Sequence, residues 1–187
     1  MFRAAILLAF HGFLRCAEFT SGEHTAFDPQ FDASRDSVDV TYTDGQPVLQ
    51  FRVKRSKTDP FAKGMTIYIG RAALPYCPVT AMVEYLATAA PPNDRPLFCL
   101  ASGTPLTHGC LTTKVRNLLV AAGVPNARNY GGHSFRIGAA TSAATCGISE
   151  WQIRALGRWQ SDCVLRYIRT RPSDLAHLAH RLDSAEI

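Results

Sequence analysis

The stretch from Gly131 to Tyr167 constrains the fold of this chain of 187 residues more than any other part. Its sequence is GGHSFRIGAATSAATCGISEWQIRALGRWQSDCVLRY, and its first half is rich in alanine. Small side chains let neighbouring backbones approach closely, so this half predicts a tightly packed helix over residues 133–146. Gly147 is typical of the residue that ends such a helix.

Two further helices are predicted in the same stretch. Ser149, followed three residues later by Gln152, has the pattern of a capping box and predicts a helix that ends near Gly157. Residue 161 or 162 then caps a helix that carries Tyr167.

The rest of the chain adds helices and strands of moderate length. Apolar residues at helical spacing predict helices over residues 2–18, 78–90 and 107–122, the last with Thr107 as its N-cap. Alternating apolar residues, with turn signals between them, predict strands over residues 38–42, 48–54 and 65–69. We therefore expect a mainly helical α+β fold with a small three-stranded antiparallel sheet.

Charge and cysteine usage limit the class of protein. The net charge of +5 suits a polyanionic partner without requiring one. Six cysteines show no zinc-like spacing, which predicts buried or half-buried free thiols in a reducing, intracellular compartment. The apolar N-terminal run is interrupted by His11 and Arg15, and no run reaches the roughly 18 residues of a membrane span.

Several polar residues have the chemistry needed to act on a phosphodiester. Arginine donates paired hydrogen bonds to phosphate and keeps its charge, which favours Arg15 and Arg136 as a clamp. His133, three residues before Arg136, can donate to phosphate or exchange protons. Lys57, at a predicted hairpin tip, could protonate a leaving oxygen, and Tyr167 is the candidate nucleophile.

Each of these residues, taken alone, also has a purely structural explanation. Arg15 and Glu18 are three residues apart and could form only a helix ion pair. Lys57 could belong to a solvated basic loop. The remaining side chains could simply lie in the core or cap a helix: His133, Trp151, Trp159 and Tyr167.

The set and its order resemble the catalytic domain of the tyrosine recombinases, the phage-integrase family. Residues 13–18 resemble the family's first-arginine motif, and residues 55–58 resemble its hairpin-lysine motif. Residues 133–136 resemble its His-x-x-Arg motif, and residues 156–159 with Tyr167 resemble its last motif and nucleophile. The sequences GGHSFRIGAAT and LGRWQSD are most similar to those of recombinases from eukaryotic DIRS- and Crypton-type mobile elements.

The resemblance implies a chemistry for each matching position. Tyr167 would attack a scissile phosphate of double-stranded DNA and give a 3′-phosphotyrosine link with a free 5′-hydroxyl. Arg15 and Arg136 would hold the non-bridging oxygens. His133 would act as acid/base or hydrogen-bond donor, and Lys57 as general acid.

The same resemblance assigns the remaining positions. Strict spacing to the tyrosine places Arg158 in the slot where the family has histidine or tryptophan, and Trp159 follows one residue later. Glu18 would support the pocket. No metal and no cofactor is implied, because the phosphotyrosine conserves the bond energy.

The resemblance also implies an organisation and a setting. Residues 1–187 would be a catalytic domain without the family's N-terminal core-binding domain. Residues 173–187 would form a tail helix whose leucines dock on a neighbouring subunit or pack on their own domain. An origin in a eukaryotic mobile element would imply action in the nucleus.

The sequence also leaves two other functions open. The chain could be a truncated or domesticated relative that binds DNA without recombining it. It could also be a phosphodiesterase or another enzyme of small anions, which would release its product by hydrolysis and form no lasting covalent adduct.

Overall fold

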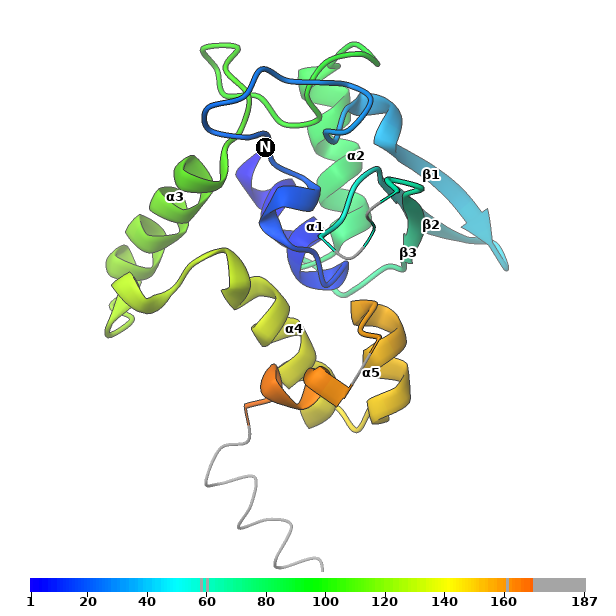
Figure 1. Cartoon of the computed structure of the whole chain (residues 1–187), viewed down its shortest axis with the longest axis vertical. Coiled ribbons are helices and arrows are strands. Elements are labelled where there is room, and N and C mark those ends of the chain that lie inside the picture. The colour runs from blue at the N-terminus through cyan, green and yellow to red at the C-terminus, as the bar shows by residue number, and fades with distance from the viewer. Residues whose placement is uncertain (58, 60, 161, 170–187) are drawn as a thin grey trace, which may run out of the picture.

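Helix α1 (Phe2–His11) is the central element of the computed structural model shown in Figure 1. The structure describes residues 1–57, 59, 61–160 and 162–169. Helix α2 (Pro78–Ala89) and helix α4 (Gly132–Thr145) both pack against α1. Three fully buried residues of α1 lie in the core: Ala5, Leu8 and Ala9.

Helix α1 ends earlier than the sequence pattern predicted. It stops at His11, and the backbone of Phe13 has a φ of +50°. A side chain at Gly12 would meet the carbonyl oxygen of Leu8 at 2.8 Å and Ile67 at 2.9 Å, so close packing on the sheet requires glycine there. The predicted helix over residues 2–18 is therefore wrong beyond His11.

A 3-10 turn follows this break. It spans Cys16–Glu18 and is preceded by Arg15 in extended conformation. Arg15 and Glu18 thus belong to a tight turn and not to an α-helix. Their three-residue spacing therefore does not make them an ion pair on a helix surface.

The three predicted strands form an antiparallel sheet in the order β1-β2-β3. They span Val38–Thr43, Gln46–Val53 and Met65–Ile69, and a short 3-10 helix at Arg35–Ser37 leads into the first. The turn between β1 and β2 has φ values of +51° and +72° at Asp44 and Gly45, as a two-residue hairpin of the primed type requires. The longer β2–β3 connection carries Lys57.

The predicted caps of two later helices are confirmed. Helix α3 (His108–Ala121) begins where Oγ1 of Thr107 accepts a hydrogen bond from the backbone N–H of Cys110 at 3.2 Å. Helix α5 (Glu150–Gly157) begins where the backbone N–H of Ser149 donates to Oε1 of Gln152 at 3.1 Å. A 3-10 turn at Ala127–Asn129 links α3 to α4.

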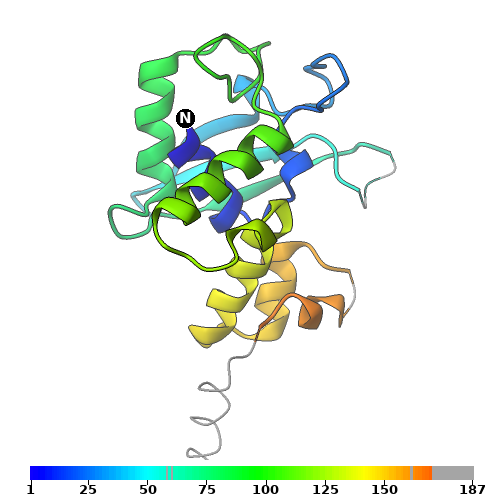
Figure 2. The ribbon, with the colours of Figure 1, turned by 90° about the vertical axis from the view of Figure 1, so that its left-hand side faces the viewer.

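Helices α4 and α5 and the 3-10 helix η4 (Asp162–Arg166) lie together at one end of the molecule in both views (Figures 1 and 2). They enclose a small apolar cluster, separate from the larger core around α1, α2 and the sheet. Its buried members are Phe13, Ala139, Ala140, Ala143, Ile153, Trp159 and Val164. Tyr167 follows η4 directly, so a 3-10 turn replaces the predicted α-helix at the nucleophile candidate.

Other expectations have mixed outcomes. Trp151 is 70% exposed, so its placement in the core was wrong. All six cysteines are described and are free thiols, although Cys146 is exposed. None of the described helices is both long enough and apolar enough to cross a membrane. The predicted tail helix over residues 173–187 lies outside the described residues. The α+β class, mainly helical with one small sheet, is confirmed.

Candidate functional site

Glu18 lies at the centre of the candidate site, and its side chain is only 1% exposed. Its Oε1 accepts hydrogen bonds from Nη1 of Arg15 at 3.0 Å and from Oγ of Ser56 at 2.9 Å. Its Oε2 accepts from Nη2 of Arg158 at 2.7 Å and from the backbone N–H of Arg15 at 2.9 Å. Four donors compensate the burial of this charge, and they join three distant parts of the chain.

Arg158 ends helix α5 in the left-handed conformation, with a φ of +58°. Arg158 also contacts two backbone carbonyls. Its Nη1 donates to the carbonyl oxygen of Gly12 at 3.0 Å, and its Nη2 lies 3.4 Å from the carbonyl oxygen of Phe13. Burial lowers the pKa of Arg158, and the charge of Glu18 opposes this shift. The break after α1 therefore supplies the carbonyl oxygens that hold this arginine.

Arg136, on helix α4, is completely buried. Its Nη1 donates to the carbonyl oxygen of Phe13 at 2.5 Å, and its Nη2 donates to that of Gly157. Its guanidinium carbon lies 4.1 Å from the ring centroid of Trp159 and 5.7 Å from that of Tyr167, which is cation–π geometry. Among the described residues, its Nε has no hydrogen-bond partner.

The charge of Arg136 responds to these surroundings. Burial is the main cause that lowers its pKa, and the nearby cations Arg15 and Arg158 act in the same direction, whereas Glu18 and Tyr167 oppose the shift; the net pKa is about 10. A pKa of about 10 still leaves the side chain protonated at neutral pH. The site is therefore a cluster of three arginines balanced by one carboxylate.

Tyr167 is held beside this cluster by its backbone and its ring. Its backbone N–H donates to the carbonyl oxygen of Val164 at 2.8 Å, and its own carbonyl accepts from Oγ1 of Thr141 at 3.2 Å. Its half-buried ring lies 5.0 Å from that of Trp159, centroid to centroid. The structure thus brings the predicted nucleophile Tyr167 next to Arg136, one of the predicted arginines.

His133 and Lys57 lie at the edges of this arrangement. His133 is exposed on the first turn of α4, one turn before Arg136. Lys57 is exposed in the β2–β3 connection and directly follows Ser56. Within the described part of the chain, no hydrogen bond or ion pair holds either side chain, so both are free to meet a ligand.

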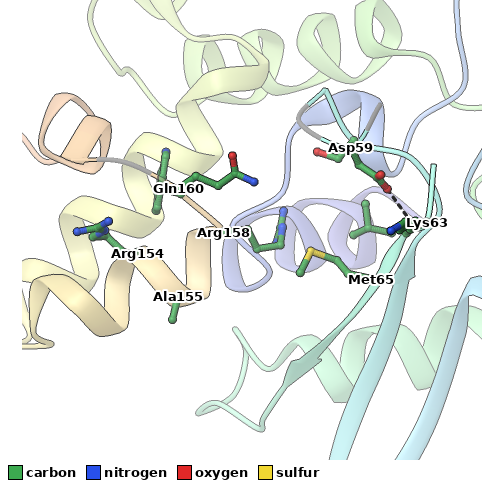
Figure 3. A pocket seen from close by; sticks show the side chains of 11 residues that line it. Asp59, Lys63, Met65, Arg154, Ala155, Arg158 and Gln160 are labelled. Carbon is green, nitrogen blue, oxygen red and sulfur yellow. Dashed lines mark hydrogen bonds between the residues drawn. The ribbon is translucent and has the colours of Figure 1, made fainter. Parts of the chain in front are cut away.

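A cleft of about 470 Å³ opens between the end of α5 and the β2–β3 connection. In the view of Figure 3, Arg158 lies between Gln160 on one side and Lys63 with Met65 on the other. The cleft is lined by Val53, Ser56, Asp59, Lys63, Gly64, Met65, Arg154, Ala155, Arg158, Trp159 and Gln160. The basic side chains of this lining favour an anionic ligand.

The sequence did not single out two parts of this site. One is Ser56, which precedes Lys57, and its only signal was that position beside a predicted site residue. The other is the pair of backbone carbonyls at Gly12 and Phe13, which no residue type can reveal. Arg158 and Trp159 both take part in the site. Arg158 forms an ion pair with Glu18, and the indole of Trp159 covers the guanidinium of Arg136.

Comparison with known proteins gave matches among solved structures only. No protein-family model and no curated protein matches the chain. The site-specific recombinase XerH, in a post-cleavage complex with a palindromic difH substrate, aligns with a TM-score of 0.67 and 18% identity, covering 97% of this chain and 45% of that one.

Two further structures agree with this match. The XerA recombinase aligns with a TM-score of 0.64 and 18% identity, over 95% of this chain and 56% of that one. The Tn1549 transposon integrase, in complex with transposon right end DNA, aligns with a TM-score of 0.54 and 15% identity, over 97% and 58%. The chain therefore has the fold found in these recombinases and spans about half of their length.

Proposed function

We propose that this chain is a tyrosine-type DNA breaking-rejoining domain, which acts on double-stranded DNA in site-specific recombination or integration. The observation that carries the proposal is the convergence of Arg15 and Arg158 on Glu18, with the buried Arg136 beside them and the Tyr167 ring centroid 5.7 Å from its guanidinium carbon. Three cations and a phenol suit the attack on a phosphodiester, whose charge must be held in the transition state. The shared fold with XerH, a recombinase bound to its difH substrate, supports it.

In the proposed reaction, the phenol oxygen of Tyr167 attacks the phosphorus and forms a 3′-phosphotyrosine bond. The bond from phosphorus to the 5′-oxygen breaks at the same centre. His133 takes the phenol proton, and Lys57 gives a proton to the 5′-oxygen, which leaves as a hydroxyl. Attack by a 5′-hydroxyl reverses each step and rejoins the strand.

The burial of Arg136 adds a step to this scheme. Its side chain is 0% exposed, whereas the side chain of Arg15 is 18% exposed and that of Arg158 is 8% exposed. For Arg136 to hold a phosphate oxygen, Trp159 and Tyr167 must move off its guanidinium. We propose that DNA binding draws this segment outward, so that Arg136 exchanges a carbonyl partner for phosphate.

One alternative function has a specific observation in its favour. If Trp159 and Tyr167 stay over Arg136 when DNA is bound, the site cannot assemble, and the chain would bind DNA without breaking it. The complete burial of Arg136 is the feature that favours this reading. Covalent capture of DNA separates the two functions.

The test uses the full chain and nicked duplexes of randomised sequence, in which the fragment with the 5′-hydroxyl escapes after cleavage. The proposal predicts a covalent protein–DNA adduct that survives denaturation and is lost in Tyr167→Phe. Binding without an adduct would support the alternative. Release of a cleaved product without an adduct would instead indicate a hydrolytic phosphodiesterase.

Self-association and origin are further parts of the proposal. We propose that the leucines of residues 173–187 dock on a second copy of the chain on DNA, and that the chain derives from a eukaryotic DIRS- or Crypton-type element acting in the nucleus. Truncation after Arg171 should then abolish assemblies larger than one copy per DNA. Unchanged assembly would contradict the docking.

A further inference from the structure

The hydroxyl of Ser56 joins the β2–β3 connection to the centre of the site. It accepts a hydrogen bond from Nη1 of Arg15 at 3.0 Å and donates one to Oε1 of Glu18 at 2.9 Å. Because Arg15 also donates to that same Oε1, the three groups close a ring of hydrogen bonds. Only a group that both donates and accepts can occupy this position in the ring.

The chain is also held just beyond Lys57. The backbone N–H of Asp59 donates to the carbonyl oxygen of Ser56 at 3.0 Å. A carboxylate oxygen of Asp59 accepts from the backbone N–H of Gly64 at 2.8 Å. Ser56 is therefore tied to the site, and Asp59 is tied both to Ser56 and to the start of β3.

The residues before Ser56 are anchored separately. Nζ of Lys54 lies 2.8 Å from a carboxylate oxygen of Asp36, and Arg55 forms an ion pair with Asp32 at 3.5 Å. Lys57 is exposed, and no described residue pairs with its side chain, whereas Arg55 and Ser56 before it are both anchored. Of these anchors, only the Ser56 hydroxyl reaches the arginines of the site directly.

We propose that Ser56 is a positioning residue, which holds Lys57 at the distance from Arg15 that transfer of a proton to the leaving oxygen requires. This inference rests on the proposed function, in which Lys57 is the general acid. It assigns the Ser56 hydroxyl a part in one step, the departure of the 5′-oxygen. Removing it should spare the attack by Tyr167, because Glu18 keeps both of its arginine partners.

The test compares two leaving groups in the randomised duplexes. One set carries the ordinary 5′-oxygen at the scissile position, and the other carries a bridging sulfur, which leaves without being protonated. We expect Ser56→Ala to form the oxygen adduct at least about tenfold more slowly than the unmodified protein, because a misplaced general acid loses part of its usual contribution. With the sulfur duplex, Ser56→Ala should match the unmodified protein. Ser56→Thr, which keeps the hydroxyl, should recover most of the rate.

Controls separate this inference from the proposed function. Lys57→Ala should show the same rescue by sulfur, whereas Arg136→Ala should be slow with both duplexes. A Ser56→Ala rate equal to that of the unmodified protein with oxygen would overturn the inference, and so would an equal deficit with both duplexes. Failure of the unmodified protein to form an adduct with either duplex would refute the proposed function itself, and this inference with it.

Discussion

Glu18 and Arg158, which are 140 residues apart in the chain, form a buried ion pair in which Nη2 of Arg158 donates to Oε2 of Glu18 at 2.7 Å. Their side chains are 1% and 8% exposed. The pair joins the turn after α1 to the end of α5, so it fixes the two halves of the candidate site relative to each other. The same carboxylate also holds Arg15, which makes Glu18 the residue on which the arrangement depends.

Glu18→Gln should destabilise the fold strongly. The amide cannot balance the charges of Arg15 and Arg158, and a buried charge without its partner costs about 3–5 kcal/mol. Urea unfolding followed by circular dichroism measures the change in the free energy of unfolding. Glu84→Gln is the matched control, because Glu84 is 59% exposed in its pair with Arg3, and exposed pairs contribute about 0–1 kcal/mol. Equal effects of the two substitutions would contradict the central role of Glu18.

Trp159 should report the uncovering of Arg136 when DNA binds. Trp151 is the only other tryptophan and is exposed, so Trp151→Phe leaves Trp159 as the single indole signal. We expect the emission of this variant to shift to longer wavelength on addition of duplex DNA, because the ring leaves its buried position 4.1 Å from the guanidinium.

Adding salt gives the control for this measurement. Phosphate contacts weaken with salt concentration, so dissociation of the duplex should restore the original emission. An unchanged emission at saturating DNA would show that Trp159 and Tyr167 still cover Arg136, and would favour binding without strand breakage.

Gly157→Ala should displace the Trp159 ring without adding any polar group. A methyl group at Gly157 would lie 1.7–2.4 Å from ring atoms of Trp159, so the indole must move. We expect a loss of about 1–3 kcal/mol in the free energy of unfolding, as for other overpacked sites. The emission of Trp159 should also be shifted in the absence of DNA.

Gly70→Ala is the control for this substitution, because nothing lies within 4 Å of a methyl group at that position. A Gly157→Ala variant with unchanged stability and emission would show that the ring is not held where the structure places it.

Arg136→Ala should separate strand cleavage from DNA binding. Arg136 is buried, so it adds little to the first encounter with the duplex, and we expect the Kd to change by less than about threefold. Formation of the adduct should fall by at least about a hundredfold, because an arginine that stabilises transition-state charge is lost. Adduct yield and fluorescence anisotropy, measured on the same preparation, test both. A parallel loss of affinity and cleavage would show that Arg136 only holds the DNA backbone.

The local signals of the sequence were sufficient for the sheet and for most helix ends. The hairpin at Asp44 and Gly45 depends on backbone preferences of the turn residues themselves, and the caps at Thr107 and Ser149 depend on side chains that bond their own helix. Such features involve neighbours in the chain, so a reading of the sequence can predict them.

The site was predictable as a set of residues but not as a geometry. The end of α1 is set by packing of Gly12 on Ile67 and by the carbonyl of Phe13, which meets Arg136 123 residues later. The role of Ser56 depends on contacts with Arg15 and Glu18, far away in the chain. No local pattern encodes these contacts, and none showed that Arg136 would be fully buried.

Peptide mapping of trapped protein–DNA adducts by tandem mass spectrometry tests the central claim most directly. The account predicts a nucleotide linked through its 3′-phosphate to the phenol oxygen of Tyr167, and no modified peptide in Tyr167→Phe. A nucleotide on any other residue, or DNA bound with no covalent link at all, would contradict it.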